Sequence, residues 1–135
     1  MATSKVIYLG GLRTNSTHLQ SGIEIITDAP LDNQGKGEAF SPTDLMATSL
    51  ANCMLTIIGI AARTHEINID GTTAEVTKVM AAEPRRVAEI HIKLYFPLHA
   101  SYSDKQKKIL EHAGLTCPVN MSLHPDLKRE INFGW

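Results

Sequence analysis

Apolar residues gather most densely near the middle of this chain, in residues 45–62. Four polar positions interrupt the run, namely Thr48, Ser49, Asn52 and Thr56. Because the run is slightly short for a membrane span and carries these interruptions, it indicates a buried helix. Ser41 can cap its start, Pro42 suits the first helical position, and Asp44 stands where the acid of a capping box reaches back. We expect this helix to continue to about Thr64.

Shorter apolar segments on either side predict strands. The candidates are residues 5–9, 18–27, 67–69, 71–80, 87–96 and 127–133, with a turn at 10–16, a loop at 28–40 and a hairpin connection at 83–86. An amphipathic helix is expected over 103–113, ended by Gly114, and a short helix can begin at Cys117-Pro118. With no repeat or linker, the chain is expected to form a single domain over residues 1–135. Its class is α+β, with strand pairs on either side of the apolar helix.

The central helix is apolar around most of its circumference. At about 100° per residue, four apolar side chains fall within about 60° of Cys53 on its face of the helix: Met46, Leu50, Ile57 and Ile60. A helix of this kind must be covered on nearly all faces. One thin sheet covers one side, so we expect a homodimer in which the helices of two subunits pack together.

Composition narrows the class of function. The chain has 135 residues, 43% apolar and 20% charged, and a formal net charge of −1. Such a balance provides no basic field for nucleic acid, and aromatic residues at 5% are too few for base stacking. The six histidines show no metal-ligand spacing with each other or with the cysteines. Two cysteines without a signal-peptide pattern indicate a reducing compartment, where a transient redox pair is possible.

Three residues are candidates for chemistry, and each has an ordinary alternative. Cys53 lies inside the apolar helix, where a free cysteine commonly acts as a small hydrophobic core residue. Cys117 precedes a proline at a predicted helix start, a position that favours thiolate over thiol, although it could be a plain turn residue. Arg13 follows Gly10-Gly11 in a turn. It could be a solvated turn residue or could approach a thiolate and lower its pKa.

Taken together, these residues resemble the OsmC/Ohr family, the osmotically inducible and organic hydroperoxide resistance proteins. The resemblance is carried by Arg13 after a glycine turn, by Ser41-Pro42-x-Asp44-Leu45 leading to Cys53, and by Cys117-Pro118-Val119 downstream. It covers essentially the whole chain. The segment GEAFSPTDL, residues 37–45, is most similar to the OsmC-like branch.

The resemblance implies an OsmC-like fold, with antiparallel sheets around the central helix in an intertwined homodimer. It implies a cytoplasmic thiol peroxidase that reduces organic hydroperoxides to alcohols without a metal, haem or flavin. Cys53 would be the peroxidatic cysteine, Cys117 would resolve its sulfenic acid to a Cys53–Cys117 disulfide, and Arg13 would steady the thiolate and polarise the peroxide. A dithiol, in this family a dihydrolipoyl group on a partner protein, would reopen the disulfide. Met46, Leu50, Ile57 and Ile60 could line an apolar substrate pocket.

One position departs from the hydroperoxide reductases, which carry a glutamate soon after the proline. Thr43 stands there in this chain, followed by Asp44. Asp44 could take the place of that acid, or Glu38 in the preceding loop could, but Asp44 also has a complete role as a helix cap. Along one helix it lies about 13–14 Å from Cys53, so the two cannot touch within a subunit.

Two other functions stay open at this point. The dimer could bind a lipid-like or aromatic small molecule or sense redox state with little peroxidase activity, or it could be a purely structural protein. Retention of both cysteines and Arg13 favours the enzyme over these alternatives.

Overall fold

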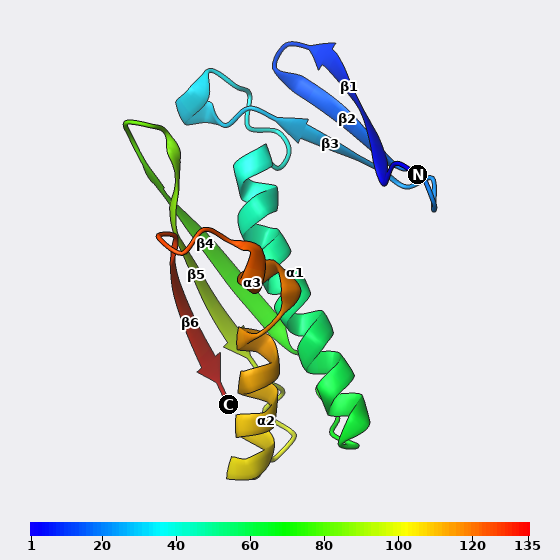
Figure 1. The fold of residues 1–135 in the computed structure, drawn as a ribbon, viewed down its shortest axis with the longest axis vertical. Coiled ribbons are helices and arrows are strands. Elements are labelled where there is room, and N and C mark those ends of the chain that lie inside the picture. The colour runs from blue at the N-terminus through cyan, green and yellow to red at the C-terminus, as the bar shows by residue number, and fades with distance from the viewer. The chain divides into compact units, whose positions relative to one another are not determined.

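Three strands, a long helix and a second group of strands and helices follow one another along the chain (Figure 1). The computed structural model describes residues 1–135. Its elements are β1 (Ser4–Gly10), β2 (Arg13–His18), β3 (Glu24–Asp28), a 3-10 turn η1 (Leu31–Asn33), α1 (Pro42–Thr64), β4 (Thr73–Ala81), β5 (Arg86–Tyr95), α2 (Asp104–Leu115), α3 (Pro118–Ser122) and β6 (Lys128–Gly134). The chain divides into two compact units, Met1–Met46 and Ala47–Trp135.

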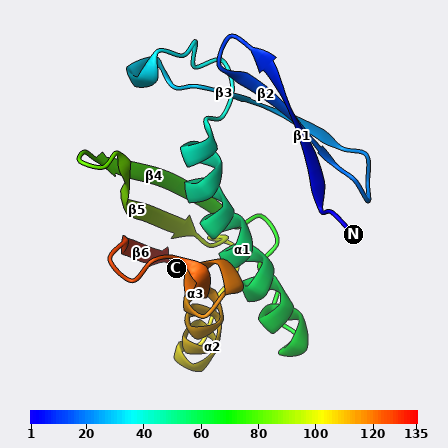
Figure 2. The ribbon, with the colours of Figure 1, turned by 45° about the horizontal axis from the view of Figure 1, so that its top comes forward.

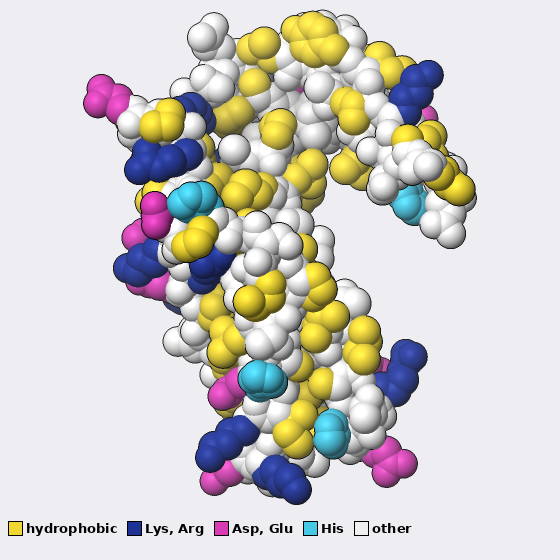
Figure 3. Space-filling model, in the orientation of Figure 1, with side chains coloured by type: hydrophobic (Ala, Val, Ile, Leu, Met, Phe, Trp, Pro, Cys, Tyr) yellow, Lys and Arg dark blue, Asp and Glu magenta, His cyan; other side chains and the backbone are white.

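The first unit is built on an antiparallel meander in the order β1-β2-β3. The tight turn between β1 and β2 places Gly10, Gly11 and Leu12 at φ of 84°, 62° and 62°, a region that two glycines adopt without strain. Apolar side chains of this sheet stay at the surface, as the hydrophobic side chains over β1–β3 in Figure 3 show. Val6, Tyr8 and Ile23 are each at least 59% exposed.

The strand predicted over residues 5–9 lies within β1, but the boundaries predicted after it were wrong. The turn ends at Leu12 rather than at residue 16, and the predicted strand over 18–27 is instead a second turn followed by β3. β2 escaped prediction because its sequence, Arg-Thr-Asn-Ser-Thr-His, has no alternating apolar positions. Its extended backbone is held by ladders to β1 and β3 on both sides, which a local pattern does not reveal.

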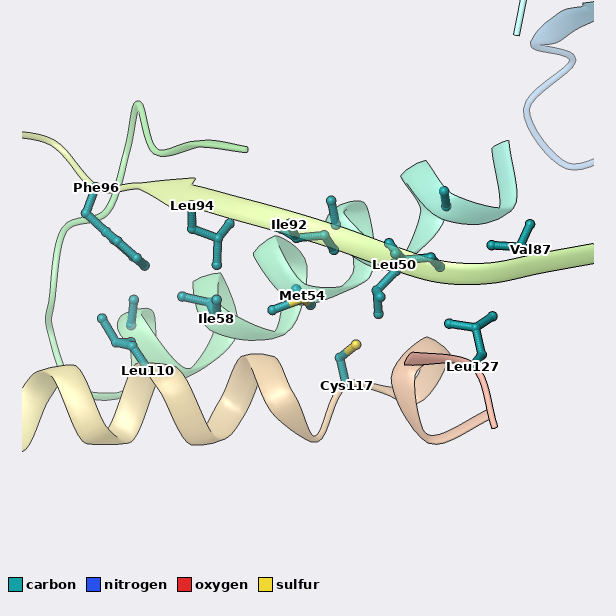
Figure 4. Packing of buried hydrophobic residues seen from close by; sticks show 14 residues of the cluster. Leu50, Met54, Ile58, Val87, Ile92, Leu94, Phe96, Leu110, Cys117 and Leu127 are labelled. Atoms are coloured by element: carbon teal, nitrogen blue, oxygen red, sulfur yellow. The ribbon is translucent and has the colours of Figure 1, made fainter. Parts of the chain in front are cut away.

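The second unit has a three-stranded sheet in the order β4-β5-β6, with α1 and α2 over one of its faces (Figures 1 and 2). β4 and β5 pair antiparallel, but β6 joins β5 in parallel, so this sheet is mixed rather than wholly antiparallel. The central strand buries one face, at Val87, Ile90, Ile92 and Leu94. Figure 4 shows Val87, Ile92 and Leu94 on the side of this strand that faces α1 and α2, where the core lies.

The long helix begins as its sequence predicts. The Ser41 hydroxyl accepts the Asp44 N–H at 3.0 Å, and the Asp44 carboxylate accepts the Ser41 N–H at 3.0 Å, which is a complete capping box. Its buried residues recur every three or four positions: Ala47, Leu50, Ala51, Met54, Ile58 and Ala62. By length and mean hydropathy, 1.8, α1 could cross a membrane, but this buried stripe makes it the core helix of the fold.

Two further boundaries differ from prediction. Residues 67–69 form no strand. α2 does not end at Gly114 but continues to Leu115. Gly114 is buried in the helix because α2 crosses α1 closely there: a Cβ atom on it would lie 2.9 Å from Ile58 Cδ1. The predicted α+β class with two small sheets and a central helix is confirmed, and the single domain over residues 1–135 stays a prediction.

Candidate functional site

Cys53 lies on α1 at the edge of the stripe that faces the core. Its neighbours Ala51 and Met54 are buried, whereas Cys53 itself is only partly buried. The backbone N–H of Val119, in α3, points at the Cys53 sulfur with an N···Sγ distance of 3.5 Å. The Cys53 residue is therefore not sealed in the core, and its sulfur accepts a backbone hydrogen bond.

Cys117 is placed by the junction of two helices. It is the N-cap of α3, directly before Pro118, and its sulfur accepts the Asn120 N–H at 3.4 Å. It is completely buried, and Figure 4 shows its sulfur pointing from the α2–α3 junction toward the core. Gly114 allows the end of α2 to approach α1, and this approach carries Cys117 toward the helix that holds Cys53.

The two sulfurs therefore receive successive N–H groups of the same short helix, those of Val119 and Asn120. Both cysteines are free thiols. Burial raises the pKa of the Cys117 thiol above its ordinary value, and the nearby Cys53 sulfur raises it further. Cys117 is therefore held as the protonated thiol. A partly buried cysteine beside a protonated, sealed one is an arrangement suited to sequential thiol oxidation.

Asn120 and Arg129 support this arrangement and were not among the sequence candidates. Asn120 Nδ2 donates to the Leu115 carbonyl at 2.6 Å, which ties α3 to the end of α2. Arg129 Nη2 donates to the Asn120 carbonyl at 3.2 Å. Asn120 Oδ1 and Arg129 Nε are buried without a partner. The sequence did contain a sign that Arg129 has a special role. Arg129 alternates with Ile131 and Phe133 on one face of β6, so it is a cation at a position where the pattern predicts an apolar residue.

Arg13 lies in the first unit, at the start of β2, directly opposite Asp28 on β3. Its guanidinium donates to both oxygens of Asp28, from Nε at 3.1 Å and from Nη2 at 2.9 Å. Nη2 also donates to Glu38 at 3.2 Å. Hydrogen bonds from Arg13 are the main cause that lowers the pKa of Asp28, and the two carboxylates raise the pKa of Arg13. Arg13 and Asp28 are therefore both charged near neutral pH.

Asp28 is a site residue that sequence reasoning missed. The chain pattern assigned it to the loop that follows β3, and an acid at a loop start carries no special signal. Its role becomes visible only through the cross-strand register with Arg13. Of the two acids that were candidates, Glu38 contacts Arg13, whereas Asp44 forms the helix cap.

The sequence candidates thus fall into two groups, one in each unit. The structure brings Cys53 and Cys117 together, and it brings Arg13 together with Glu38. Leu50, expected in a substrate pocket, is fully buried in the core, whereas Met46 is 37% and Ile60 58% exposed and Ile57 is half-buried. No group of three or more His, Cys, Asp or Glu side chains is arranged to hold a metal ion.

Comparison with known proteins decides the family. Residues 35–132 match the model of a family described as OsmC-like protein. The chain belongs to the OsmC-like family. A crystal structure from Psychrobacter arcticus 273-4, named for an osmotic stress induced and detoxification response, is 65% identical over 98% of this chain and 96% of its own, with a TM-score of 0.94. Among curated proteins, no sequence matches this chain.

More distant members of the OsmC-like family share the fold. An organic hydroperoxide resistance protein OsmC from Legionella pneumophila is 16% identical over 100% of this chain and 98% of its own, with a TM-score of 0.73. One from Elizabethkingia anophelis is 14% identical over 99% and 96%, with a TM-score of 0.71. Resemblance of the sequence to the OsmC/Ohr family is thereby confirmed at the level of family and fold.

Proposed function

We propose that this protein is a thiol peroxidase that reduces organic hydroperoxides to alcohols, with Cys53 as the peroxidatic and Cys117 as the resolving cysteine. The observation that carries the proposal is the pair of free sulfurs held by successive N–H groups of α3, one partly exposed and one sealed. Membership in the OsmC-like family supports it, as do the names of the hydroperoxide resistance proteins that share the fold.

The first step forms one bond and breaks another. The Cys53 thiolate attacks the outer oxygen of the hydroperoxide, so that an S–O bond forms while the O–O bond breaks. The departing alkoxide takes a proton and leaves as the alcohol, and Cys53 becomes a sulfenic acid. The sulfur has lost the two electrons that the peroxide has gained.

Resolution follows within the subunit. The Cys117 sulfur attacks the Cys53 sulfur, the S–S bond forms, the S–O bond breaks, and the hydroxide leaves with the Cys117 proton as water. Burial of Cys117 suits this order of events, because a protonated, sealed thiol is a poor target for peroxide itself. A dithiol reductant of the dihydrolipoyl type, in the cytoplasm, then restores both thiols by exchange.

Arg13 is the proposed electrophilic partner in the first step. A guanidinium that donates to the peroxide would stabilise negative charge as the O–O bond breaks. Glu38 is its proposed acidic partner, supported by the 3.2 Å contact between them, while Asp44 serves the helix cap.

The active form is proposed to be a homodimer. Large apolar side chains of the first unit are exposed, among them Ile7 and Ile26, which both pair with Asn15 and so share the face that carries Arg13. So is Ile60, on the outer side of α1. Apolar surface of this extent on a small chain marks an interaction site. In the dimer, Arg13 is proposed to act at a Cys53 site that two subunits share.

Single-turnover oxidation by cumene hydroperoxide tests the chemistry. The reduced wild type should consume about one equivalent and lose both free thiols, while Cys53→Ser should consume none. Cys117→Ser should still react with peroxide but accumulate a sulfenic acid that dimedone traps. Full peroxide consumption by Cys53→Ser would refute the mechanism. A wild type that keeps two thiols after peroxide would point to a binding or structural protein instead.

A further inference from the structure

Asp28 is enclosed in the first unit, and both of its carboxylate oxygens contact the Arg13 guanidinium. We infer that Asp28 is a positioning residue for hydroperoxide reduction: it fixes the plane of the Arg13 guanidinium, which then donates to the peroxide. The inference rests on the proposed function and adds a residue that acts through Arg13. Such a clamp matters because a donor fixed in advance needs no reorganisation when charge develops.

Asp28 and Glu38, the two acids that contact Arg13, differ in how far their side chains are exposed to solvent. The Asp28 side chain is 0% exposed and accepts two hydrogen bonds from the guanidinium, which is the planar, two-point contact that orients an arginine. The Glu38 side chain is 63% exposed and accepts one bond. An exposed single contact exchanges readily with water. Asp28 is therefore the fixed partner, and Glu38 is the one that can be released.

The backbone anchors Asp28 on several sides. It pairs with Arg13 across the β2–β3 ladder, so the two side chains project from the same face. Its N–H donates to the Phe40 carbonyl at 3.0 Å, and its Oδ2 accepts the Glu38 N–H at 3.1 Å. The carboxylate thus holds both the arginine and the loop that carries Glu38.

The contacts of Arg13 with Asp28 and Glu38 determine how much positive charge and which N–H donors of Arg13 remain for a substrate. Arg13 and the two carboxylates carry a formal charge of −1 together, and Lys36 also lowers the pKa of Asp28, so the net positive field at Arg13 is small. Its Nε and Nη2 are used by the acids, and Nη1 has no partner on this chain. A guanidinium held in this way acts as a positioned hydrogen-bond donor. A lysine, which keeps the charge but not the planar fork, cannot replace it.

The test measures the rate constant for oxidation of reduced protein by cumene hydroperoxide in a stopped-flow instrument. Asp28→Asn should lower it by about tenfold to a hundredfold, the cost of a misplaced donor. Arg13→Lys and Arg13→Ala should lower it at least as much. Reduction of the preformed disulfide by dihydrolipoamide should stay within about twofold of wild type in every variant, because that step does not use the peroxide donor.

A double-mutant cycle distinguishes positioning from a general structural effect. If Asp28 acts through Arg13, adding Asp28→Asn to Arg13→Ala should change the rate constant by less than about twofold. Glu24→Gln is the matched control. It removes a charge from the same strand, where Glu24 contacts Asn15 and Thr17 instead of Arg13. It should leave the rate constant unchanged.

Each outcome decides one claim. A wild type that is not oxidised by hydroperoxide refutes the proposed function. An active wild type with Asp28→Asn within about twofold of it refutes only the role of Asp28, as does a full additional loss in the Arg13→Ala background. If Asp28→Asn fails to fold by circular dichroism, Arg13→Lys carries the test, and full activity of that variant overturns the inference.

Discussion

At the scale of single residues, the two cysteines differ mainly in their access to solvent. Cys53 is partly exposed, whereas Cys117 is sealed at the α2–α3 junction. Burial and the neighbouring sulfur both raise the pKa of Cys117, so its proton is retained until a partner sulfur is oxidised. The proposed roles of Cys53 as the attacking thiol and Cys117 as the resolving thiol are thus consistent with their different burial.

This raised pKa predicts a pH-dependent stability. The unfolded chain loses the Cys117 proton near pH 9, while the folded protein keeps it to higher pH. The contribution to the free energy of unfolding is therefore fully present below about pH 9 and is lost as the pH rises through the folded-state pKa. Urea unfolding of the reduced protein from about pH 7 to 10.5 measures this loss.

Cys117→Ala is the control for that measurement. It should lower stability at pH 7 by about 1–2 kcal/mol through the cavity it leaves. Its free energy of unfolding should also fall less steeply in alkali than that of the wild type. Tyr102, whose pKa burial also raises, contributes the same slope to both proteins. An identical slope in the two proteins would contradict the assignment to Cys117.

At the scale of elements, the site depends on how α2 and α3 meet α1. Gly114 sets the distance between α2 and α1, and Asn120 sets the attachment of α3 to α2. Both contacts position the α2–α3 junction that carries Cys117, one through helix packing and one through a hydrogen bond. They can therefore be changed separately.

Gly114→Val tests the close helix crossing. The added side chain would meet Ile58 and Met54, which are both buried in the core. We expect a loss of about 1–3 kcal/mol in the free energy of unfolding, typical of overpacking, measured by urea denaturation. Gly59→Ala in α1 is the contrast, because a Cβ at Gly59 meets nothing within 4 Å. Equal effects of the two changes would argue against close packing at Gly114.

Asn120→Ala tests the attachment of α3. The variant loses the side-chain bond to the Leu115 carbonyl but keeps the backbone N–H that donates to the Cys117 sulfur. We expect peroxide to oxidise Cys53 at the wild-type rate but the disulfide to form about tenfold more slowly, because the resolving thiol is held less firmly. Dimedone labelling against time measures the sulfenic acid. Disulfide formation at the wild-type rate would show that α3 does not need this bond.

Sequence reasoning succeeded where signals were local. Ser41 and Asp44 indicate the start of α1, and the length of the apolar run indicates where it ends. The helix was therefore predicted together with its cap. It failed where a partner strand supplies the information. β2 has no apolar alternation, and the buried state of Asp28 depends on Arg13 across the ladder. The end of α2 at Gly114 was predicted wrongly for the same reason. In one sequence, a glycine that ends a helix cannot be told from a glycine that packs against another helix.

At the scale of the whole molecule, the exposed apolar residues of the first unit are the observation on which the proposed homodimer rests. Adjacent residues of β3 sample the two faces of its sheet, because side chains alternate along a strand. Ile26 pairs with Asn15, which places it on the same face as Arg13 and Asp28, whereas Ile25 projects from the other face. Both isoleucines are 47% exposed. If two subunits share the catalytic site, the face that carries Arg13 is the one covered.

Ile26→Lys should therefore disrupt the proposed dimer. A lysine ammonium in an apolar interface must be desolvated without a partner, which should weaken association by about a hundredfold, or ~3 kcal/mol. Size-exclusion chromatography with light scattering at micromolar concentration should report the mass of one chain, and hydroperoxide reduction should be lost with the dimer. Ile25→Lys, the same change at the same exposure on the opposite face, should stay dimeric and active. A monomeric wild type, or dissociation by Ile25→Lys alone, would contradict the assignment of the interface to the Arg13 face.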